Sequence, residues 1–122
     1  MNTIVSHWID GRETEPGTAT LEKFNPHDGR LLCRVADGSR ELVGQAVQAA
    51  AQAFPAWAET TPVKRGQVLS ALAALMKQRT DELADCIAEE TGKPPQDARG
   101  EVGGATLQAE YFAGEGMRLH GR

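Results

Sequence analysis

Two kinds of side chain in this 122-residue sequence could do chemistry: neighbouring carboxylates and cysteine thiols. Glu89 and Glu90 stand side by side in the stretch EETGKPPQDARGEVGG, residues 89–104, where a helix is expected to end. Carboxylates at that end of a helix face the negative pole of its dipole, which costs roughly 0.3–1 kcal/mol each. General acid–base chemistry would need a pocket around the pair, and no pocket can be read from the sequence. With Asp81 and Asp85 they are therefore predicted to form a solvated face.

The cysteines, Cys33 and Cys86, are predicted to lie in a strand and in a helix. They form no CxxC pair and no His/Cys cluster, so a zinc site is not supported. Cys86 has no histidine close in sequence, and we favour two reduced thiols over a catalytic nucleophile. The histidines are widely separated, show no metal-ligand spacing and are predicted to lie at the surface: His7, His27 and His120.

Two short motifs resemble nucleotide-binding loops but lack required residues. TGKP at 91–94 ends like a P-loop, yet Ile87 and Pro94 stand where a glycine and a Ser or Thr are needed. Gly114 and Gly116 begin a dinucleotide fingerprint, but Leu119 occupies its third glycine position and no apolar strand precedes it. The residues alone therefore reveal no catalytic site.

Composition restricts the class of protein. The net charge is −4, with 25% charged and 40% hydrophobic residues, as in one ordinary globular domain. The acidic residues are dispersed, and there is no basic stripe of the kind that binds nucleic acid. No apolar run approaches the ~20 residues of a membrane span, and the start MNTIVSHWIDG lacks the features of a signal peptide. We expect a cytoplasmic protein that binds neither nucleic acid nor membranes.

Residues 1–38 are predicted to form a small antiparallel β-ribbon. Asp10-Gly11 between two β-compatible segments is a strong hairpin signal. Residues 20–24 can form a strand, NPHDG at 25–29 is a turn, and residues 31–35 alternate apolar and other side chains. Three such short strands are marginally stable unless something packs on them.

Residues 39–122 are predicted to form about four helices, which makes the fold mainly α, within a single domain spanning 1–122. Ser39 and Thr61 are N-cap candidates, Pro55 should end or kink the first helix, and Gly92 should terminate the third. Apolar residues at steps of three and four give the helices apolar stripes, namely Val43, Val47, Phe54 and Trp57; Leu69, Leu72, Leu75 and Met76; and Leu83 and Ile87.

The last helix, about 96–114, carries a stripe of small residues, which comprises Ala98, Val102, Ala105, Ala109 and Phe112. Gly100, Gly103 and Gly104 each cost about 1 kcal/mol relative to alanine inside a helix. From the residues alone, close packing against another helix is favoured over a ligand as the reason for these glycines.

Six segments, taken in order, are more specific than any single motif. They are WIDGRE (8–13), FNPHDGRLLCRVADG (24–38), AVQAAAQAFPAW (46–57), PVKRGQVLSALAALM (62–76), EETGKPPQDARGEV (89–102) and YFAGEGMRLHG (111–121). Together they resemble the N-terminal portion of the NAD(P)-dependent aldehyde dehydrogenase superfamily. The resemblance covers essentially the whole chain, with the blocks in the expected order and close to the expected spacing.

The resemblance implies that the chain is the outer part of a Rossmann-like α/β cofactor-binding domain. In the family a cysteine thiolate attacks the aldehyde, hydride passes to the nicotinamide, and a glutamate-activated water hydrolyses the thioester. Those residues lie beyond residue 122 in the family pattern, and neither Cys33 nor Cys86 matches the catalytic cysteine. We therefore expect no catalytic or cofactor-binding residues here, NAD or NADP only in the complete enzyme, and no activity from this chain alone.

The resemblance also implies a monovalent cation site for K⁺ or Na⁺ in some family members. The matching positions are Lys23 and Phe24 for backbone carbonyls and Glu90 for the side chain, where the family often has aspartate. A cation there would offset the unfavourable position of Glu90 in the helix dipole. The alternative is that Glu90 is solvated or paired with Lys93 or Arg99.

The glycine-rich helix matches a family helix that borders the aldehyde tunnel. By position, Gly100 and Gly104, with Leu107 or Gln108 a turn further on, would face that tunnel. Missing side chains would widen it for a bulky or polar substrate. ARGEV and YFAGEGMR are similar to members that act on semialdehydes of sugar-acid breakdown, such as 2-oxoglutarate semialdehyde.

Two functions remain open from the sequence. The chain is part of an aldehyde dehydrogenase whose partner is the remainder of the polypeptide, or it is a non-enzymatic helical interaction module derived from that fold. In either case its apolar helix faces should promote self-association when nothing else covers them.

Overall fold

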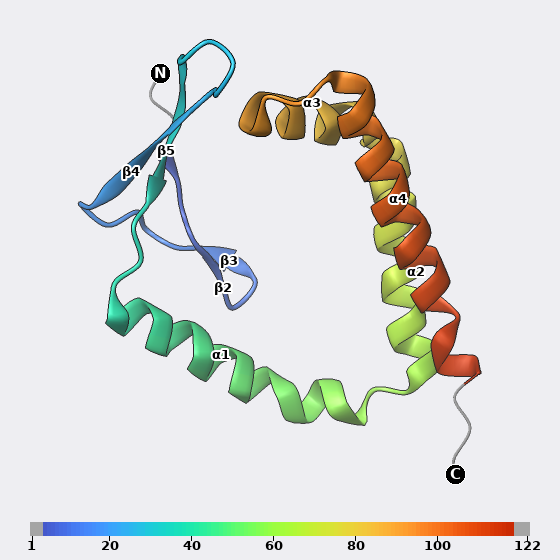
Figure 1. Ribbon diagram of the computed structural model, residues 1–122. Helices are drawn as coiled ribbons and strands as arrows, with labels where there is room; N and C mark the ends of the chain where they lie inside the picture. The colour runs from blue at the N-terminus through green and yellow to red at the C-terminus, as the bar shows by residue number, and fades with distance from the viewer. Residues whose placement is uncertain (1–3, 119–122) are drawn as a thin grey trace. The chain divides into compact units, whose positions relative to one another are not determined.

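The computed structural model describes residues 4–118 (Figure 1), and the chain divides into two compact units, Met1–Glu59 and Thr60–Arg122. The described elements of the first unit are β1 (Ile4–Val5), β2 (Trp8–Ile9), β3 (Arg12–Glu13), β4 (Thr20–Phe24), β5 (Leu31–Ala36) and α1 (Arg40–Glu59). Those of the second are α2 (Pro62–Gln78), α3 (Thr80–Thr91), α4 (Pro95–Ala113) and a 3₁₀ turn, η1 (Glu115–Met117).

Local turn chemistry produces the antiparallel pairs of the first unit. Asp10 and Gly11 both have positive φ, 56° and 71°, as the tight hairpin turn between β2 and β3 requires. Between β4 and β5, the side chain of Asn25 accepts a hydrogen bond from the backbone N–H of His27 at 2.8 Å, and Gly29 has φ 73°. Both predicted hairpins are confirmed.

The structure adds a parallel pairing that local patterns do not indicate. β1 pairs in parallel with β5, with Ile4 opposite Arg34 and Val5 opposite Val35. The resulting sheet has the order β1-β5-β4, while β2 and β3 form a separate two-stranded sheet. A parallel pair has no connecting turn whose residues could reveal it, because its strands are distant in sequence.

Helix α1 begins as predicted, but it does not end at Pro55. The hydroxyl of Ser39 accepts the backbone N–H of Leu42 at 3.1 Å, which caps the first turn. The helix then continues through Pro55 to Glu59. A proline near the end of a helix removes one backbone hydrogen bond, and the remaining bonds of the last turn still form.

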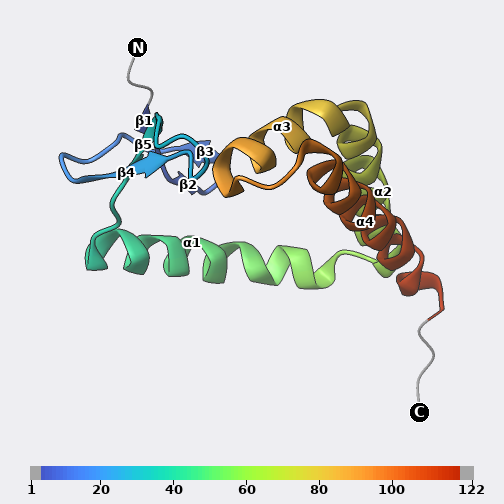
Figure 2. The same ribbon diagram turned by 45° about the horizontal axis from the view of Figure 1, so that its top comes forward.

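The second unit is a helical assembly in which α4 packs against both α2 and α3. Figures 1 and 2 show α2 and α4 side by side. Thr61 caps α2, accepting the backbone N–H of Lys64 at 3.4 Å, and Pro62 occupies the first helical position. Gly92, at φ 73°, ends α3 in the left-handed conformation, as predicted.

The core of this unit is built from small side chains. Ala84 of α3 and Ala98 and Val102 of α4 are buried, and partly buried Leu83, Ile87 and Ala88 pack against them. Small side chains at the contact allow two helices to approach closely. Because the packing is dense, removing even one methyl group affects stability.

The predicted buried stripe of α4 is partly wrong. Ala98, Val102 and Thr106 form the buried face, whereas Ala105 and Phe112 are exposed. Thr106 is tolerated there because its hydroxyl donates a hydrogen bond to the carbonyl oxygen of Val102 at 2.7 Å. The stripe is therefore rotated toward the i, i+4, i+8 row.

Close packing around the α4 glycines is also not what the structure shows. A Cβ atom added at Gly100, Gly103 or Gly104 would meet nothing within 4 Å. The close approach lies at two other glycines: a Cβ at Gly66 would overlap the carbonyl oxygen of Ala113, and one at Gly116 would lie 2.7 Å from the carbonyl oxygen of Pro62. Periodicity identifies glycines in a helix, but not which of them meets a neighbouring backbone.

Many of the predicted apolar side chains remain exposed. Helix α1 has no buried residue, and Val43, Val47, Phe54 and Trp57 are all exposed, as are Leu72 and Leu75 of α2. On α4, Phe112 is exposed as well, whereas Val102 is buried.

Two valine-to-alanine changes should separate core from surface. Val102 is 3% exposed and Val47 is 64% exposed. Because it leaves a cavity between helices, Val102→Ala should lower the free energy of unfolding by roughly 1–3 kcal/mol, whereas Val47→Ala should change it by less than about 0.5 kcal/mol. Urea denaturation followed by circular dichroism measures both, and equal effects would contradict the assigned core.

Candidate functional site

The predicted tunnel residues lie together on one exposed face of α4. Gly100, Gly104, Leu107 and Gln108 are all exposed and lie one turn apart along the helix. At about 100° per residue this row points away from the buried row of Ala98, Val102 and Thr106. We call Gly100, Gly104, Leu107 and Tyr111 the open face of α4.

Tyr111 belongs to this face and was missed by sequence reasoning. It follows Leu107 by one turn and is exposed. Its ring packs edge-on against Phe112, with centroids 5.4 Å apart, and the guanidinium of Arg118 lies 5.3 Å from the ring centroid. Its spacing of four residues from Leu107 was the signal that could have identified it.

The open face has room for a bound molecule or for a larger side chain. Around Gly100 and Gly104 the space that a Cβ would occupy is empty to 4 Å. The chemistry of the face is apolar and aromatic, with the amide of Gln108 at its edge. Such a surface can shape and orient a substrate, but it offers no nucleophile or base.

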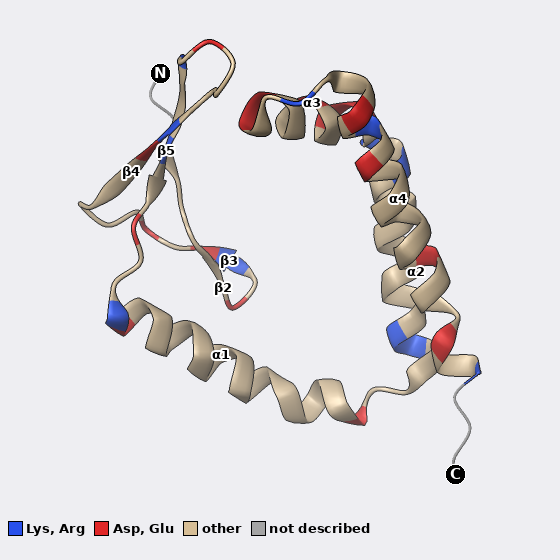
Figure 3. Ribbon diagram, in the orientation of Figure 1, with Lys and Arg blue, Asp and Glu red and all other residues tan. Residues whose placement is uncertain are grey.

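Charged side chains fix α4 from its edges rather than on its open face. Lys77 of α2 pairs with Glu110, Lys93 of the α3–α4 loop pairs with Glu101, and Asp81 of α3 pairs with Arg99 at 3.0 Å. Figure 3 shows charges distributed along the helices of this unit. Largely exposed pairs of this kind contribute about 0–1 kcal/mol each, so they orient the helix more than they stabilise it.

The residues of the predicted cation site lie in different units. Lys23 and Phe24 are in β4 of the first unit, and Glu90 is exposed in the last turn of α3 in the second. The K⁺ or Na⁺ site therefore stays a prediction. Within residues 4–118, no group of three or more His, Cys, Asp or Glu side chains could hold a metal ion.

The thiols and imidazoles do not converge on a site in the described part of the chain. Cys33 is half-buried in β5 and Cys86 is exposed in α3, both as free thiols. His27 is exposed in the β4–β5 turn, while His7, predicted at the surface, is half-buried with its Nε2 atom shielded. The reason is packing of the ring near Gly38, where an added Cβ would lie 3.6 Å from His7 Cε1. His120 lies outside the described residues.

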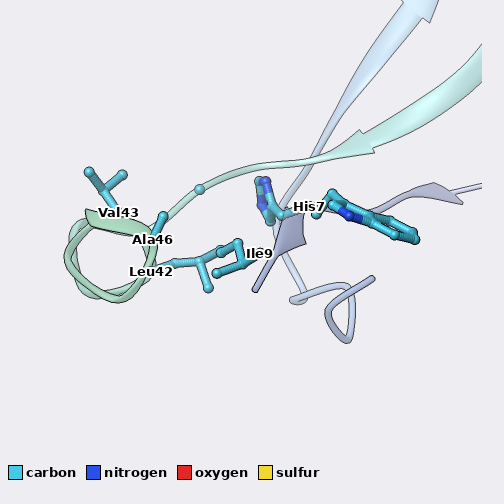
Figure 4. A pocket seen from close by; sticks show the side chains of 7 residues that line it. His7, Ile9, Leu42, Val43 and Ala46 are labelled. Carbon is cyan, nitrogen blue, oxygen red and sulfur yellow. The ribbon is translucent and has the colours of Figure 1, made fainter. Parts of the chain in front are cut away.

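The first unit has a shallow hollow of about 260 Å³ (Figure 4). Ile9 and Leu42 approach each other across it, and His7 lies beside them; its lining residues are His7, Trp8, Ile9, Gly38, Leu42, Val43 and Ala46. The volume is below the roughly 300–1,000 Å³ of typical ligand pockets.

Neither this hollow nor the two rejected motifs fits a dinucleotide cofactor. The lining has no Lys, Arg or glycine-rich loop to hold a pyrophosphate. Thr91-Gly92-Lys93 lies at the end of a helix and does not follow a strand, and Gly114 precedes the 3₁₀ turn after α4 while Gly116 lies within it. Neither the hollow nor these two glycine segments therefore forms a site for NAD(P).

Among residues 4–118, two groups have shifted pKa values, and both shifts have local causes. Hydrogen bonds from its own backbone N–H and from the Ser39 hydroxyl lower the pKa of Glu41 at the start of α1. A hydrogen bond and the charge of Glu115 raise the pKa of Arg118. Neither group has the environment of an acid–base catalyst.

The comparison with known proteins now decides the family. A sequence model described as "Aldehyde dehydrogenase family" matches residues 12–122. The chain belongs to the aldehyde dehydrogenase family. Across residues 4–118, no helix combines the length and apolar character needed to cross a bilayer.

Similar proteins agree with this assignment and show how much of an enzyme the chain represents. It is 36% identical to malonate-semialdehyde dehydrogenase 1 of Geobacillus kaustophilus, over 98% of the chain but 25% of that protein. It is 34% identical to alpha-ketoglutaric semialdehyde dehydrogenase of Bacillus subtilis, over 99% of the chain and 24% of that protein. The chain thus spans about a quarter of the length of these relatives.

Solved structures give the same result for the fold. Methylmalonate-semialdehyde dehydrogenase from Oceanimonas doudoroffii superimposes with a TM-score of 0.93 at 35% identity, over 98% of this chain and 25% of the other. PnpE, solved in complex with nicotinamide adenine dinucleotide, gives 0.92 at 34% identity, over 100% and 25%. The chain therefore corresponds to the N-terminal portion of these proteins, and the predicted fold class is confirmed.

The cation prediction can be checked without any assay of activity. If Glu90 supplies a ligand for K⁺ or Na⁺, titrating either salt against a choline chloride background should raise the melting temperature of the wild-type chain. Glu90→Ala should abolish that rise, because the other ligands are backbone carbonyls. Identical salt responses of the two proteins would contradict the site.

Proposed function

We propose that this chain is the N-terminal part of an NAD(P)-dependent aldehyde dehydrogenase that oxidises an aldehyde or semialdehyde to a carboxylate in the cytoplasm. The observation that carries the proposal is the match of nearly the whole chain to about a quarter of each relative. The described residues supply elements for packing and a face for substrate, and no thiol in a catalytic environment. On this proposal the 122 residues alone are inactive.

The exposed apolar side chains of α1 indicate what the chain requires as a partner. Val43, Val47, Phe54 and Trp57 follow at helical spacing, and charged residues occur only near the ends of the helix, at Arg40, Glu41 and Glu59. A helix with such a stripe is stable in water when another apolar surface covers it. The proposed cover is the remainder of the enzyme, or self-association in its absence.

The open face of α4 is the proposed border of the substrate route. Gly100 and Gly104 leave space that a longer side chain would fill, and Leu107 and Tyr111 add apolar area. Two relatives are named for carboxylate-bearing semialdehydes. A semialdehyde of that class, for example 2-oxoglutarate semialdehyde, is the proposed substrate, because a widened route accepts the second polar group.

The proposal is tested by separating the chain from the rest of the enzyme. The purified 122-residue chain should give no reduced nicotinamide with any semialdehyde, because it lacks the thiolate and the cofactor site. A polypeptide that continues the chain with the remaining three-quarters of the Bacillus subtilis relative should restore turnover. Oxidation by the chain alone would overturn the proposal, and a chimera that folds and binds NAD yet stays inactive would favour the interaction module.

The substrate face has its own test in the complete enzyme. Gly104→Met should fill the open face and lower kcat/KM for a bulky semialdehyde roughly tenfold more than for a two-carbon aldehyde. Gly44→Met is the matched control, since it makes the same change in another helix, α1, where an added Cβ also meets nothing within 4 Å. If Gly104→Met changed kcat/KM equally for large and small aldehydes, α4 would not border the substrate route.

A further inference from the structure

Two glycines bring the C-terminal end of α4 into backbone contact with α2. Gly66 is buried, and a Cβ there would overlap the carbonyl oxygen of Ala113. A Cβ at Gly116, just after α4, would lie 2.7 Å from the carbonyl oxygen and 2.8 Å from the Cβ of Pro62. The atoms that would be hit belong largely to the backbone, so rotation of a side chain cannot relieve the overlap.

The N-terminal end of α4 is held in place by its contacts with α3. Ala98 and Val102 are buried against α3 together with Ala84, and Asp81 pairs with Arg99 across the same contact. A side chain at Gly66 would therefore displace the C-terminal half of α4 away from α2 while its N-terminal half stays in place.

That displacement would move the open face. Ala113 lies on the side of α4 that meets α2, whereas Leu107 and Tyr111 lie on roughly the opposite side of the same helix. Leu107 and Tyr111 are exposed, and the ring contacts of Tyr111 are with Phe112 and Arg118, which belong to the same end of the chain segment that would move. Less than an ångström of shift suffices to change how far such side chains protrude into a substrate route.

We propose that Gly66 is a positioning residue for substrate selection: its missing side chain sets the distance between α2 and α4 and thereby the width of the route along Leu107 and Tyr111. The proposal deepens the proposed function and rests on it. Gly66 does not touch the substrate; it acts through the position of α4. Gly116 has the same role at the end of the helix.

The experiment measures kcat/KM of the complete enzyme for a series of aldehydes of increasing size. Gly66→Ala should lower kcat/KM for the largest aldehyde roughly tenfold more than for the smallest, mainly through KM, because a displaced face misplaces bulky substrates most. Gly44→Ala is the matched control: the same substitution in a helix, on α1 and into open space, should leave the size profile unchanged.

A second change distinguishes positioning from simple destabilisation. Leu107→Ala in the Gly66→Ala background should restore much of the activity with large aldehydes, since it removes the side chain that was pushed into the route. A merely structural defect would lower kcat/KM equally for all aldehydes. A substitution on the far side of the helix would not rescue it. If Gly66→Ala fails to fold, Gly116→Ala tests the neighbouring contact, between the turn after α4 and Pro62 at the start of α2.

The outcomes separate this inference from the function on which it rests. A size-dependent loss that Leu107→Ala rescues supports the inference. If Gly104→Met changes the size profile but Gly66→Ala and Gly116→Ala do not, or if Leu107→Ala gives no rescue, Gly66 is not a positioning residue. If Gly104→Met also has no size dependence, the proposed substrate route fails as well.

Discussion

The contact of α2 with the end of α4 is the constraint on which the second unit depends. Backbone meets backbone there because Gly66 has no side chain, and Gly116, just after α4, permits a similar approach to Pro62. At the other end of α4, Ala84 and Ala98 are fully buried in the contact with α3. Dense packing between small residues leaves little freedom, so the position of α4 is determined at both ends.

Because packing occupies only one side of α4, the other side is available for function. Since the packing area lies on the row of Ala98, Val102 and Thr106, the opposite row can carry glycines at about 1 kcal/mol each without losing the helix. Ion pairs at the edges, such as Lys77 with Glu110, add orientation at little cost. A rigid helix with an empty outer face is a suitable wall for a substrate route.

The first unit differs from the second, because much of its apolar surface is exposed. Its strands are short and its helix α1 buries no residue, although Phe54 and Trp57 bring large apolar area. Such area is expected of a scaffold whose relatives are about four times longer. On the proposed function, the chain is part of a larger folding unit, in which packing and chemistry are contributed by different segments.

Turns, caps and helix ends could be predicted from the sequence, whereas contacts between distant segments could not. The hairpin at Asp10-Gly11, the caps at Ser39 and Thr61, and the stop at Gly92 all depend on residues within one turn, and each was predicted correctly. The parallel partner of β1, the burial of Thr106 in place of Ala105, and the close approach at Gly66 rather than at the α4 glycines depend on segments distant in sequence. The sequence therefore determined the elements, their ends and the family, while the tertiary structure alone decided which glycine meets a backbone and which face of α4 stays open, because both follow from how helices pack and not from any helix by itself.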